Sequence, residues 1–425
     1  MWAPERGLEL RNWLPVLVWL AALAVALNSG WVVAYRLLYL FTGLILLGLF
    51  WSAGTVWSLS VRREPLRGAL HAGDVLVERV LVRNRSFLPQ MWVALEDESE
   101  LPLHLMRQVL SYIGPRSQRQ FILRTLCLRR GRYRLGPAVL SAGDPFGIFR
   151  TRRRLKAGAT VVVYPRVFAL DSLSLLAGLL QVDTRRARRS PEPTTDVATV
   201  RDYRSGDEFR RIHWRSTARH GRLMSKEFDY SPGGDVWIVL DMQQHVQAGS
   251  LLPIGGGAQG PPLDSQSWPA VEPSTEEYAV SMAASIAACL LRAEREVGFL
   301  SYAESRHLVQ PDRGERHLGR ILDILAVSRA IGRIPLDHVL QREAHNFRRF
   351  DTVVLITPSV DEAWVDTAHA LALRGLRVLA VVVDRDTFTD RLGSHRIKRL
   401  LAAWRLPFCV VENGRRPDEA LCLMA

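Results

Sequence analysis

Residues 12–61 read NWLPVLVWLAALAVALNSGWVVAYRLLYLFTGLILLGLFWSAGTVWSLSV, and the only charged side chain among them is Arg36. At about 1.5 Å of rise per residue these positions would form roughly 75 Å of helix, whereas the hydrocarbon core of a bilayer is about 30 Å thick. The stretch is therefore predicted to cross a membrane twice, as a helical hairpin within residues 1–61. Asn28, Ser29 and Gly30 are the expected turn, because Asn and Gly tolerate the backbone angles of a tight reversal.

The arginines that flank this stretch predict its orientation. They lie before the first helix and after the second, at Arg6, Arg11, Arg62, Arg63 and Arg67, while Arg36 alone lies near the turn. Positive residues favour the cytoplasmic side, so both ends are expected there. A cleaved signal peptide is the competing interpretation, but the second apolar segment and the lack of a small-x-small cleavage site argue against it. We expect a multi-pass protein of the cell inner (plasma) membrane, with its N-terminus and soluble domains in the cytoplasm.

The rest of the 425-residue chain is long enough for two or more domains. Its net charge of +13 admits nucleic acid, anionic lipid or an acidic protein as a partner. The cysteines are scattered, without C-x-x-C spacing, and are expected to be reduced thiols: Cys127, Cys289, Cys409 and Cys422.

Residues 64–165 are predicted to form an all-β sandwich. Short runs rich in Val, Ile and Leu recur at 74–83, 91–96, 120–128 and 159–164, separated by Pro, Gly and Asn. The first run, DVLVERVLVR, alternates apolar and polar residues, as a strand with one buried face does. A connector at residues 166–230 follows.

Residues 235–425 have a different pattern, with continuous apolar runs at 236–240, 297–302, 352–356, 378–383 and 408–411. Such runs are typical of strands buried on both faces. Helical stretches separate them at 276–292, 315–329, 361–374 and 391–404. The alternation predicts a doubly wound, mainly parallel α/β sheet. Residues 246–275 are rich in Gly, Pro, Ser and Gln and are predicted to be a flexible insertion.

Between the two domains lies an arginine-rich segment, RDYRSGDEFRRIHWRSTARHGRLMSKEFD, at residues 201–229. Arg211, Arg215 and Arg219 are four apart and would share one face of a helix. Arginine forks match carboxylates and phosphates, so this face could bind an anion or a partner. Alternatively, the acids at Asp202, Asp207 and Glu208 could neutralise the arginines in an internal network.

This segment closely resembles the signature of the bacterial "domain of unknown function 58" family, R-[ED]-Y-x-x-G-D-x-x-R-x-I-x-W-x-x-[ST]-A-R-x-G-x-L-x-x-K. The matching residues are Arg201, Tyr203, Gly206, Asp207, Arg210, Ile212, Trp214, Thr217, Ala218, Arg219, Gly221, Leu223 and Lys226. His213 departs from the aspartate that commonly precedes the tryptophan. Residues 130–150, RGRYRLGPAVLSAGDPFGIFR, resemble the second recurrent segment of the family.

The resemblance implies two N-terminal transmembrane helices, an immunoglobulin-like β-domain and a von Willebrand factor A-like α/β domain. It also implies genetic association with MoxR-type AAA+ ATPases, but no settled biochemical activity. On this basis the candidate partner-binding or anion-binding residues are Arg201, Tyr203, Gly206, Asp207, Arg210, Trp214, Arg219 and Lys226.

The resemblance also raises a possible metal site, since von Willebrand A domains bind Mg²⁺ through D-x-S-x-S after their first strand. Here the aspartate is Asp241, but both serines are replaced, by Gln243 and His245. After the fourth strand, Thr357-Pro358-Ser359 stands where an aspartate is expected. Mg²⁺ prefers hard oxygen ligands, and most are missing. We therefore expect no cofactor, with Asp241 as the one candidate metal ligand.

No P-loop, H-E-x-x-H or G-x-S-x-G motif is present, and no constellation of residues indicates catalysis. We interpret the chain as a non-catalytic, membrane-anchored scaffold or adaptor that docks a protein, plausibly a MoxR-type AAA+ ATPase, and infer no small-molecule substrate. One alternative is a metal-dependent binding module that uses Asp241. Another is a nucleic-acid-binding membrane protein, although the arginine-rich runs at 152–154 and 185–189 lack the interleaved aromatics that stack bases. For a tethered domain the anionic headgroups of membrane lipid are the nearer partner, and a solvated basic linker is the favoured interpretation of both runs.

Overall fold

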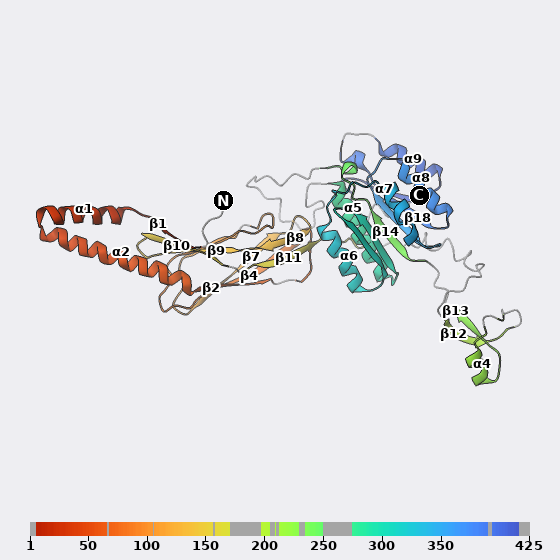
Figure 1. The fold of residues 1–425 in the computed structure, drawn as a ribbon, viewed down its shortest axis with the longest axis horizontal. Coiled ribbons are helices and arrows are strands. Elements are labelled where there is room, and N and C mark those ends of the chain that lie inside the picture. Colours follow the sequence, from red (N-terminus) through yellow and green to blue (C-terminus); the bar gives the residue numbers. More distant parts are fainter. Residues whose placement is uncertain are drawn as a thin grey trace. The chain divides into compact units, whose positions relative to one another are not determined.

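A computed structural model describes residues 6–65, 68–104, 106–155, 158–170, 197–204, 209, 212–228, 234–249, 274–389 and 393–415 (Figure 1). The chain divides into two compact units. The first consists mainly of Met1–Arg166 and contains a helical hairpin and mainly antiparallel sheets. The second contains a small hairpin of strands and a six-stranded sheet with helices.

The N-terminal hairpin is formed by α1 (Leu14–Ser29) and α2 (Val32–Ser58). The chain reverses direction after α1, at Gly30, the last residue of the predicted turn. Gly30 has a φ of +63°, and its backbone N–H donates to Ala26 O. Glycine suits this left-handed position because it has no Cβ to clash. The sequence thus placed the reversal correctly.

Small side chains and one polar contact hold this hairpin together. Ala22, Ala26 and Ala34 are buried, and small residues allow two helices to approach closely. Trp19 Nε1 donates to Thr42 Oγ1 at 2.8 Å, so the indole N–H is satisfied within the hairpin. By length and composition, Val32–Ser52 of α2 is long and apolar enough to cross a membrane.

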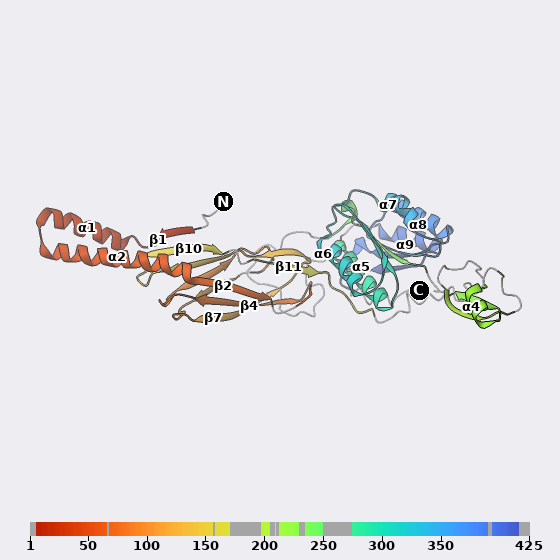
Figure 2. The same cartoon turned by 60° about the horizontal axis from the view of Figure 1, so that its bottom comes forward.

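Eleven strands build the β-domain of the first unit. They are β1 (Arg6–Leu10), β2 (Leu59–Pro65), β3 (Leu70–His71), β4 (Val75–Asn84), β5 (Val93–Asp97), β6 (Arg107–Leu110), β7 (Gln118–Leu126), β8 (Gly131–Leu135), β9 (Ala138–Gly143), β10 (Phe149–Leu155) and β11 (Ala159–Tyr164). The sheet orders are β1-β10-β9-β5-β6, β2-β4-β7 and β3-β11-β8. Figure 2 shows β2, β4 and β7 together beside the end of α2.

The main core of this domain lies between two of its sheets. Val80 and Val82 of β4 share one buried cluster with Val93 and Leu95 of β5 and with Leu140 of β9. Along β4 every second side chain is buried, from Leu76 to Asn84, which is the period of a strand with one covered face. Two sheets therefore pack face to face across alternating apolar side chains.

The domain boundaries differ from those predicted at two places. Residues 1–61 were assigned to the hairpin, yet β1 pairs with β10, with Leu8 opposite Thr151. In addition, β2 begins at Leu59, directly after α2 ends at Ser58. A five-residue strand has too little sequence to show periodicity, so its membership of the sheet is decided by its tertiary partner.

The second unit is centred on a sheet of the order β16-β15-β14-β17-β18-β19. Its strands are β14 (Val236–Leu240), β15 (Val297–Tyr302), β16 (Arg306–Asp312), β17 (Thr352–Thr357), β18 (Arg377–Val383) and β19 (Phe408–Val411). All neighbours are parallel except β15 and β16. The antiparallel edge strand β16 was not predicted, because its sequence RHLVQPD is polar and half-exposed.

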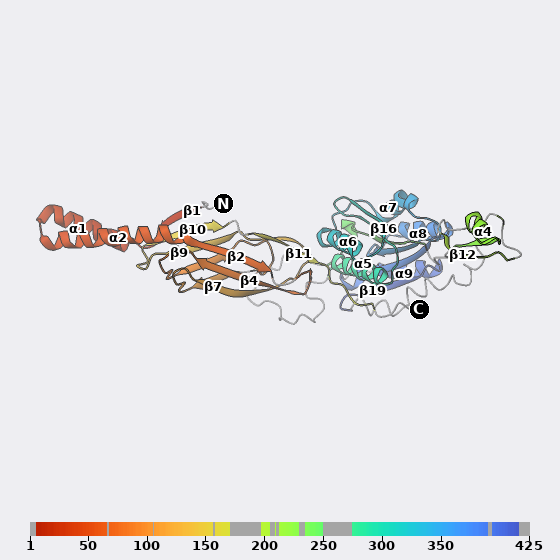
Figure 3. The same ribbon diagram turned by 90° about the horizontal axis from the view of Figure 1, so that it is seen from below.

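Helices cover both faces of this sheet (Figure 3). They are α5 (Thr275–Arg292), α6 (Glu315–Val327), α7 (Leu336–Glu343), α8 (Ala363–Leu373) and α9 (Ser394–Ala403). Trp237 and Val239 belong to a core shared with Leu340 of α7, Trp364 of α8 and Ile397 of α9. The alternate residues of β14 point to the opposite face, and α5 also lies against this strand. This is the mainly parallel, helix-covered sheet that the sequence predicted.

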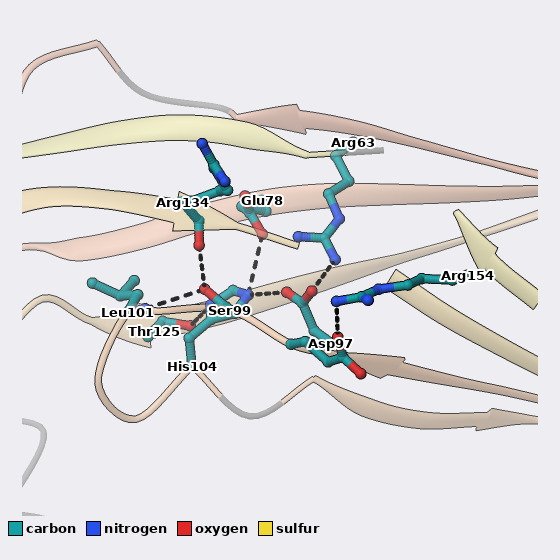
Figure 4. Close-up of polar contacts among 10 residues, drawn as sticks. Arg63, Glu78, Asp97, Ser99, Leu101, His104, Thr125, Arg134 and Arg154 are labelled. Carbon is teal, nitrogen blue, oxygen red and sulfur yellow. Dashed lines mark hydrogen bonds and ion pairs between the residues drawn. The ribbon is translucent and has the colours of Figure 1, made fainter. Parts of the chain in front are cut away.

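A cluster of charged side chains is buried inside the β-domain (Figure 4). Arg63 Nη2 lies 2.8 Å from Asp97 Oδ1, and His104 Nε2 lies 3.0 Å from Asp97 Oδ2. The other imidazole nitrogen is 2.9 Å from Thr125 Oγ1. Glu78 points inward from β4, and its Oε2 is 3.8 Å from His104 Nε2. Asp97 is thus well paired, whereas Glu78 has one distant partner in the described residues.

The pKa values of the two buried carboxyl groups shift in opposite directions. Burial raises the pKa of Glu78, and the positive charges of His104 and Arg63 only partly oppose it. Burial also acts on Asp97, but the hydrogen bonds from His104 and Arg63 outweigh it and lower the pKa of that carboxyl. The ionised form is therefore favoured at Asp97 and disfavoured at Glu78.

Glu78→Gln is expected to stabilise the β-domain near pH 8, because it removes a buried charge without a close partner. With its pKa raised in the folded state, Glu78 contributes stability below its ordinary value of 4.5 and loses it as the pH rises through the folded-state value. The gain from the substitution should vanish near pH ~4. Amide hydrogen exchange in β4 and β7 measures both effects.

Asp97→Asn serves as the matched comparison. It leaves Arg63 buried without its carboxylate, so it should cost about 3–5 kcal/mol at neutral pH. Glu78→Gln and Asp97→Asn should therefore shift hydrogen exchange at pH 8 in opposite directions. Shifts in the same direction would show that Asp97 is not the better paired of the two carboxylates.

Candidate functional site

The arginine-rich segment folds as a small module, defined here as the signature module, of β12 (Val197–Asp202), α4 (Trp214–His220) and β13 (Met224–Phe228). The two strands are antiparallel, with Arg201 opposite Ser225. Of the predicted site residues, the module places Arg201 on β12, Tyr203 just after it, Trp214 and Arg219 on α4, and Lys226 on β13. Gly206, Asp207 and Arg210 lie outside the described residues, as does Arg211.

His213 caps the helix of this module. Its Nδ1 accepts a hydrogen bond from the backbone N–H of Ser216 at 3.2 Å and lies 2.7 Å from Ser216 Oγ. An aspartate at the same position would accept the same N–H, since both side chains offer an acceptor at the helix start. The departure from the resembled signature is therefore explained by capping, which needs an acceptor and not an acid.

Hydrogen bonds tie α4 to β13. His213 N donates to Met224 O at 2.8 Å, and Met224 N donates to Thr217 Oγ1 at 3.1 Å. Ile212 and Met224 are buried between them. The helix ends at Gly221, whose φ is +66° and whose N–H donates to Thr217 O. The threonine and glycine of the signature thus hold the short helix in place.

The outer surface of the signature module is apolar and basic. Phe209 is 72% exposed and Trp214 is 63% exposed, although large aromatic side chains are usually buried. Arg215 and Arg219, four residues apart on α4, are exposed as well. Arg222 forms an ion pair with Asp202 at 3.1 Å, so part of the charge is neutralised internally. The sequence identified Trp214 and Arg219 as candidate binding residues, whereas Phe209 was not among the candidates.

The second candidate position, Asp241, lies where β14 and β17 end side by side. Thr357 Oγ1 donates to Asp241 Oδ2 at 2.6 Å, and Gln243 N donates to Oδ1 at 3.0 Å. The carboxylate is buried, and burial raises its pKa to about 6, although both hydrogen bonds oppose the shift. In parallel α/β sheets ligands bind at such strand ends, where the connections diverge.

The surroundings of Asp241 do not fit a metal ion. Both carboxylate oxygens accept hydrogen bonds from the protein, and Gln243 and His245 stand where hard oxygen ligands would be needed. Within the described ranges, His, Cys, Asp and Glu side chains form no group of three that could hold a metal. The expectation that the protein has no cofactor stays a prediction.

Asp241→Asn is expected to stabilise β14 and β17 above pH ~6, by roughly 1–3 kcal/mol. Because the folded-state pKa of about 6 exceeds the ordinary 3.8, Asp241 contributes stability below pH 3.8 and loses it as the pH rises through 6. Hydrogen exchange of the β14 and β17 amides at pH 5 and pH 8 measures the difference.

Thr357→Val is the control for this effect. It removes the hydroxyl donor from the carboxylate and should destabilise the same strands at pH 8 by about 1–3 kcal/mol, with a smaller loss at pH 5. Equal losses at both pH values would contradict an ionised Asp241 at pH 8.

Comparison with known proteins gives one family and one full-length relative. The family model described as "Protein of unknown function DUF58" matches residues 199–252, which include most of the signature module and β14. "Uncharacterized protein YeaD" of Bacillus subtilis (strain 168) is 22% identical over 398 residues, covering 90% of each chain. Similarity thus extends far beyond the segment that the family model matches.

Solved structures align only with parts of the chain. The CARDB domain of the PF1109 protein from Pyrococcus furiosus matches 25% of this chain and 86% of its own, at 13% identity and a TM-score of 0.19. The C-terminal domain of wzt matches 26% and 75%, also at 13% identity and a TM-score of 0.19. Such scores support no argument about fold or function. Residues 199–252 thus match the DUF58 family, and the similarity to the Bacillus subtilis protein extends over most of the chain.

Proposed function

We propose that this protein is a non-catalytic, membrane-tethered scaffold that docks a protein partner in the cytoplasm. In this proposal α1 and α2 both span the membrane. The β-domain is immunoglobulin-like, and the α/β domain is von Willebrand factor A-like. The partner in this proposal is a MoxR-type AAA+ ATPase, as the family resemblance implies.

The surface of the hairpin supports the membrane tether. Apolar side chains on both helices, such as Leu17, Leu40 and Phe50, are exposed, and a helix that is apolar all round needs lipid or protein around it. α1 would be about 24 Å long, somewhat less than the hydrocarbon core. Because α1 packs along α2, the two helices would enter the bilayer together, and thinning or tilting accommodates such a mismatch.

The observation that carries the docking proposal is the exposure of Trp214, Arg215 and Arg219 on the one short helix of the signature module. Tryptophan and arginine are enriched among the residues that dominate binding energy in protein interfaces. An exposed aromatic ring and exposed cations on one short helix suit a partner that presents an apolar pocket and acidic residues. The basic surface therefore favours an acidic partner.

The two alternatives have less support. A metal-dependent module would need ligands that the surroundings of Asp241 do not offer. For a nucleic-acid binder, arginines 152–154 were the candidate run in the β-domain. Arg152 instead forms an ion pair with Glu9, and Arg154 forms one with Glu98. Part of their positive charge is therefore neutralised, which weakens their attraction for phosphates. The other run, 185–189, lies outside the described residues.

Replacing Trp214 by Ala and Arg219 by Glu in the full-length protein should weaken partner binding by tenfold or more, since one such anchor contributes about 2 kcal/mol. The measurement is co-purification from solubilised membranes, followed by titration with a purified MoxR-type AAA+ ATPase. The matched control is Leu373→Ala with Arg374→Glu, which changes an exposed apolar residue and a neighbouring arginine at the end of α8. Equal loss in both double variants, or no loss in the first, would refute docking through the signature module.

Reporter fusions test the orientation separately. A fusion after Gly30 should report the outer side of the membrane, and one after Arg67 should report the cytoplasm. A cytoplasmic signal at Gly30 would rule out the proposed double crossing and leave the docking result unaffected.

A further inference from the structure

The hairpin is joined to the β-domain without a linker. Ser58 is the last residue of α2 and Leu59 the first of β2. Ser58 O accepts the N–H of Arg85 at 2.9 Å, and Ser52 Oγ lies 2.7 Å from Thr151 Oγ1. The start of α1 is fixed to the same end of the domain, because Arg11 N donates to Ile148 O at 2.8 Å. Both helices therefore leave the bilayer beside the same loops.

One of these loops lies at the level of the apolar part of α2. A Cβ added to Gly48 would be 3.4 Å from Asp144 Oδ2 and 3.4 Å from Phe149 Cδ2. Gly48 precedes Ser52, the end of the membrane-length apolar segment, by about 6 Å of helix rise. Loop 144–148 therefore reaches the depth at which α2 is still apolar, and its Phe146 is 47% exposed.

Two further loops join it at this end of the domain. Loop 84–92 begins at Asn84, whose Oδ1 accepts from Ser58 Oγ at 3.3 Å. Loop 111–117 is bridged to it through Gln90 and Ile113. We call loops 84–92, 111–117 and 144–148 the membrane-proximal rim. Its exposed large apolar side chains are Phe87, Met91, Tyr112 and Phe146.

The membrane-proximal rim is also basic. Arg85 and Arg116 are exposed, and the Arg116 guanidinium lies 4.1 Å from the centre of the Phe87 ring. The three loops contain one acidic residue, Asp144. Its carboxylate is buried and accepts the N–H groups of Phe146 and Phe149. Exposed charge on the rim is thus positive.

Arginines also lie over two tryptophan rings, that of Trp92 in the rim and that of Trp57 in α2. The guanidinium carbons of Arg11 and Arg150 lie 5.6 and 5.2 Å from the Trp92 ring centre, and that of Arg153 lies 5.4 Å from Trp57. Tryptophan and tyrosine prefer the membrane interface, and arginine is attracted to anionic headgroups. Aromatic and cationic groups therefore occur together at this end of the domain.

We propose that the membrane-proximal rim is a lipid-binding surface that seats the β-domain on anionic headgroups of the bilayer that holds the hairpin. Phe87 and Phe146 insert at the headgroup level, while Arg85 and Arg116 contact lipid phosphates. This proposal rests on the membrane tether proposed above. Its consequence is a β-domain held in one orientation to the membrane, instead of one that swings on a tether.

The test uses the full chain with its four native cysteines replaced, labelled with an environment-sensitive dye at one introduced cysteine, in vesicles with or without phosphatidylglycerol. Labels at Phe87→Cys and Phe146→Cys should be quenched by headgroup-level nitroxide lipids and shielded from aqueous iodide. The control is Leu103→Cys, an exposed apolar residue in loop 98–104, which follows the opposite end of β5 and carries Glu98 and Glu100. Its label should remain open to iodide.

Charge reversal tests the electrostatic part. Arg85→Glu with Arg116→Glu should lower the docked fraction on phosphatidylglycerol vesicles, with each arginine worth roughly fivefold in the docking equilibrium. The same variant on neutral vesicles should change little. A label at Leu40→Cys in α2 reports insertion independently.

The outcomes separate the two proposals. If acyl-chain nitroxides fail to quench Leu40→Cys, the membrane tether itself is wrong. If Leu40→Cys is quenched while Phe87→Cys and Phe146→Cys are as open to iodide as Leu103→Cys, the lipid-binding rim is refuted. Shielding in native membranes but not in lipid vesicles would assign the rim to a protein and also refute the proposal.

Discussion

The direct passage of α2 into β2 is the constraint on which the first unit depends. Ser58 ends the helix, and Leu59 already pairs with Asn84 in the sheet. A helix and a strand joined without a loop cannot reorient freely, and the contact between Ser52 and Thr151 fixes them further. The hairpin and the β-domain therefore behave as one body, so the exposed aromatic side chains at this end of the domain keep a constant position relative to the hairpin.

Charge is distributed unevenly over this framework. Inside the β-domain, Arg63 and His104 compensate Asp97, while Glu78 occupies an inward position of β4 at a cost in stability. Outside it, arginines lie beside exposed aromatic rings, on the rim and on the signature module. The buried charges specify internal structure, whereas the exposed ones suit partners that carry negative charge.

The signature module shows how a family motif divides between structure and binding. Thr217 and Gly221 hold the short helix, and His213 caps it. Trp214 and Arg219 are both exposed, so their side chains have no packing role inside the module. A motif match therefore names residues with two different purposes, and only their burial and hydrogen bonds distinguish them.

The sequence alone determined the helical hairpin, its turn near Gly30 and the buried strands of the α/β domain. Each of these features shows as an apolar run or a turn signal within one short stretch of the chain. Its arginine-rich segment also predicted the resemblance to the DUF58 family, whose model matches residues 199–252. Tertiary structure decided what periodicity cannot encode: the pairing of β1 with β10, the antiparallel edge strand β16, the meeting of Arg63, Asp97 and His104, and the gathering of three separate loops into the rim. Each joins residues far apart in the chain, and only the folded backbone brings them within contact.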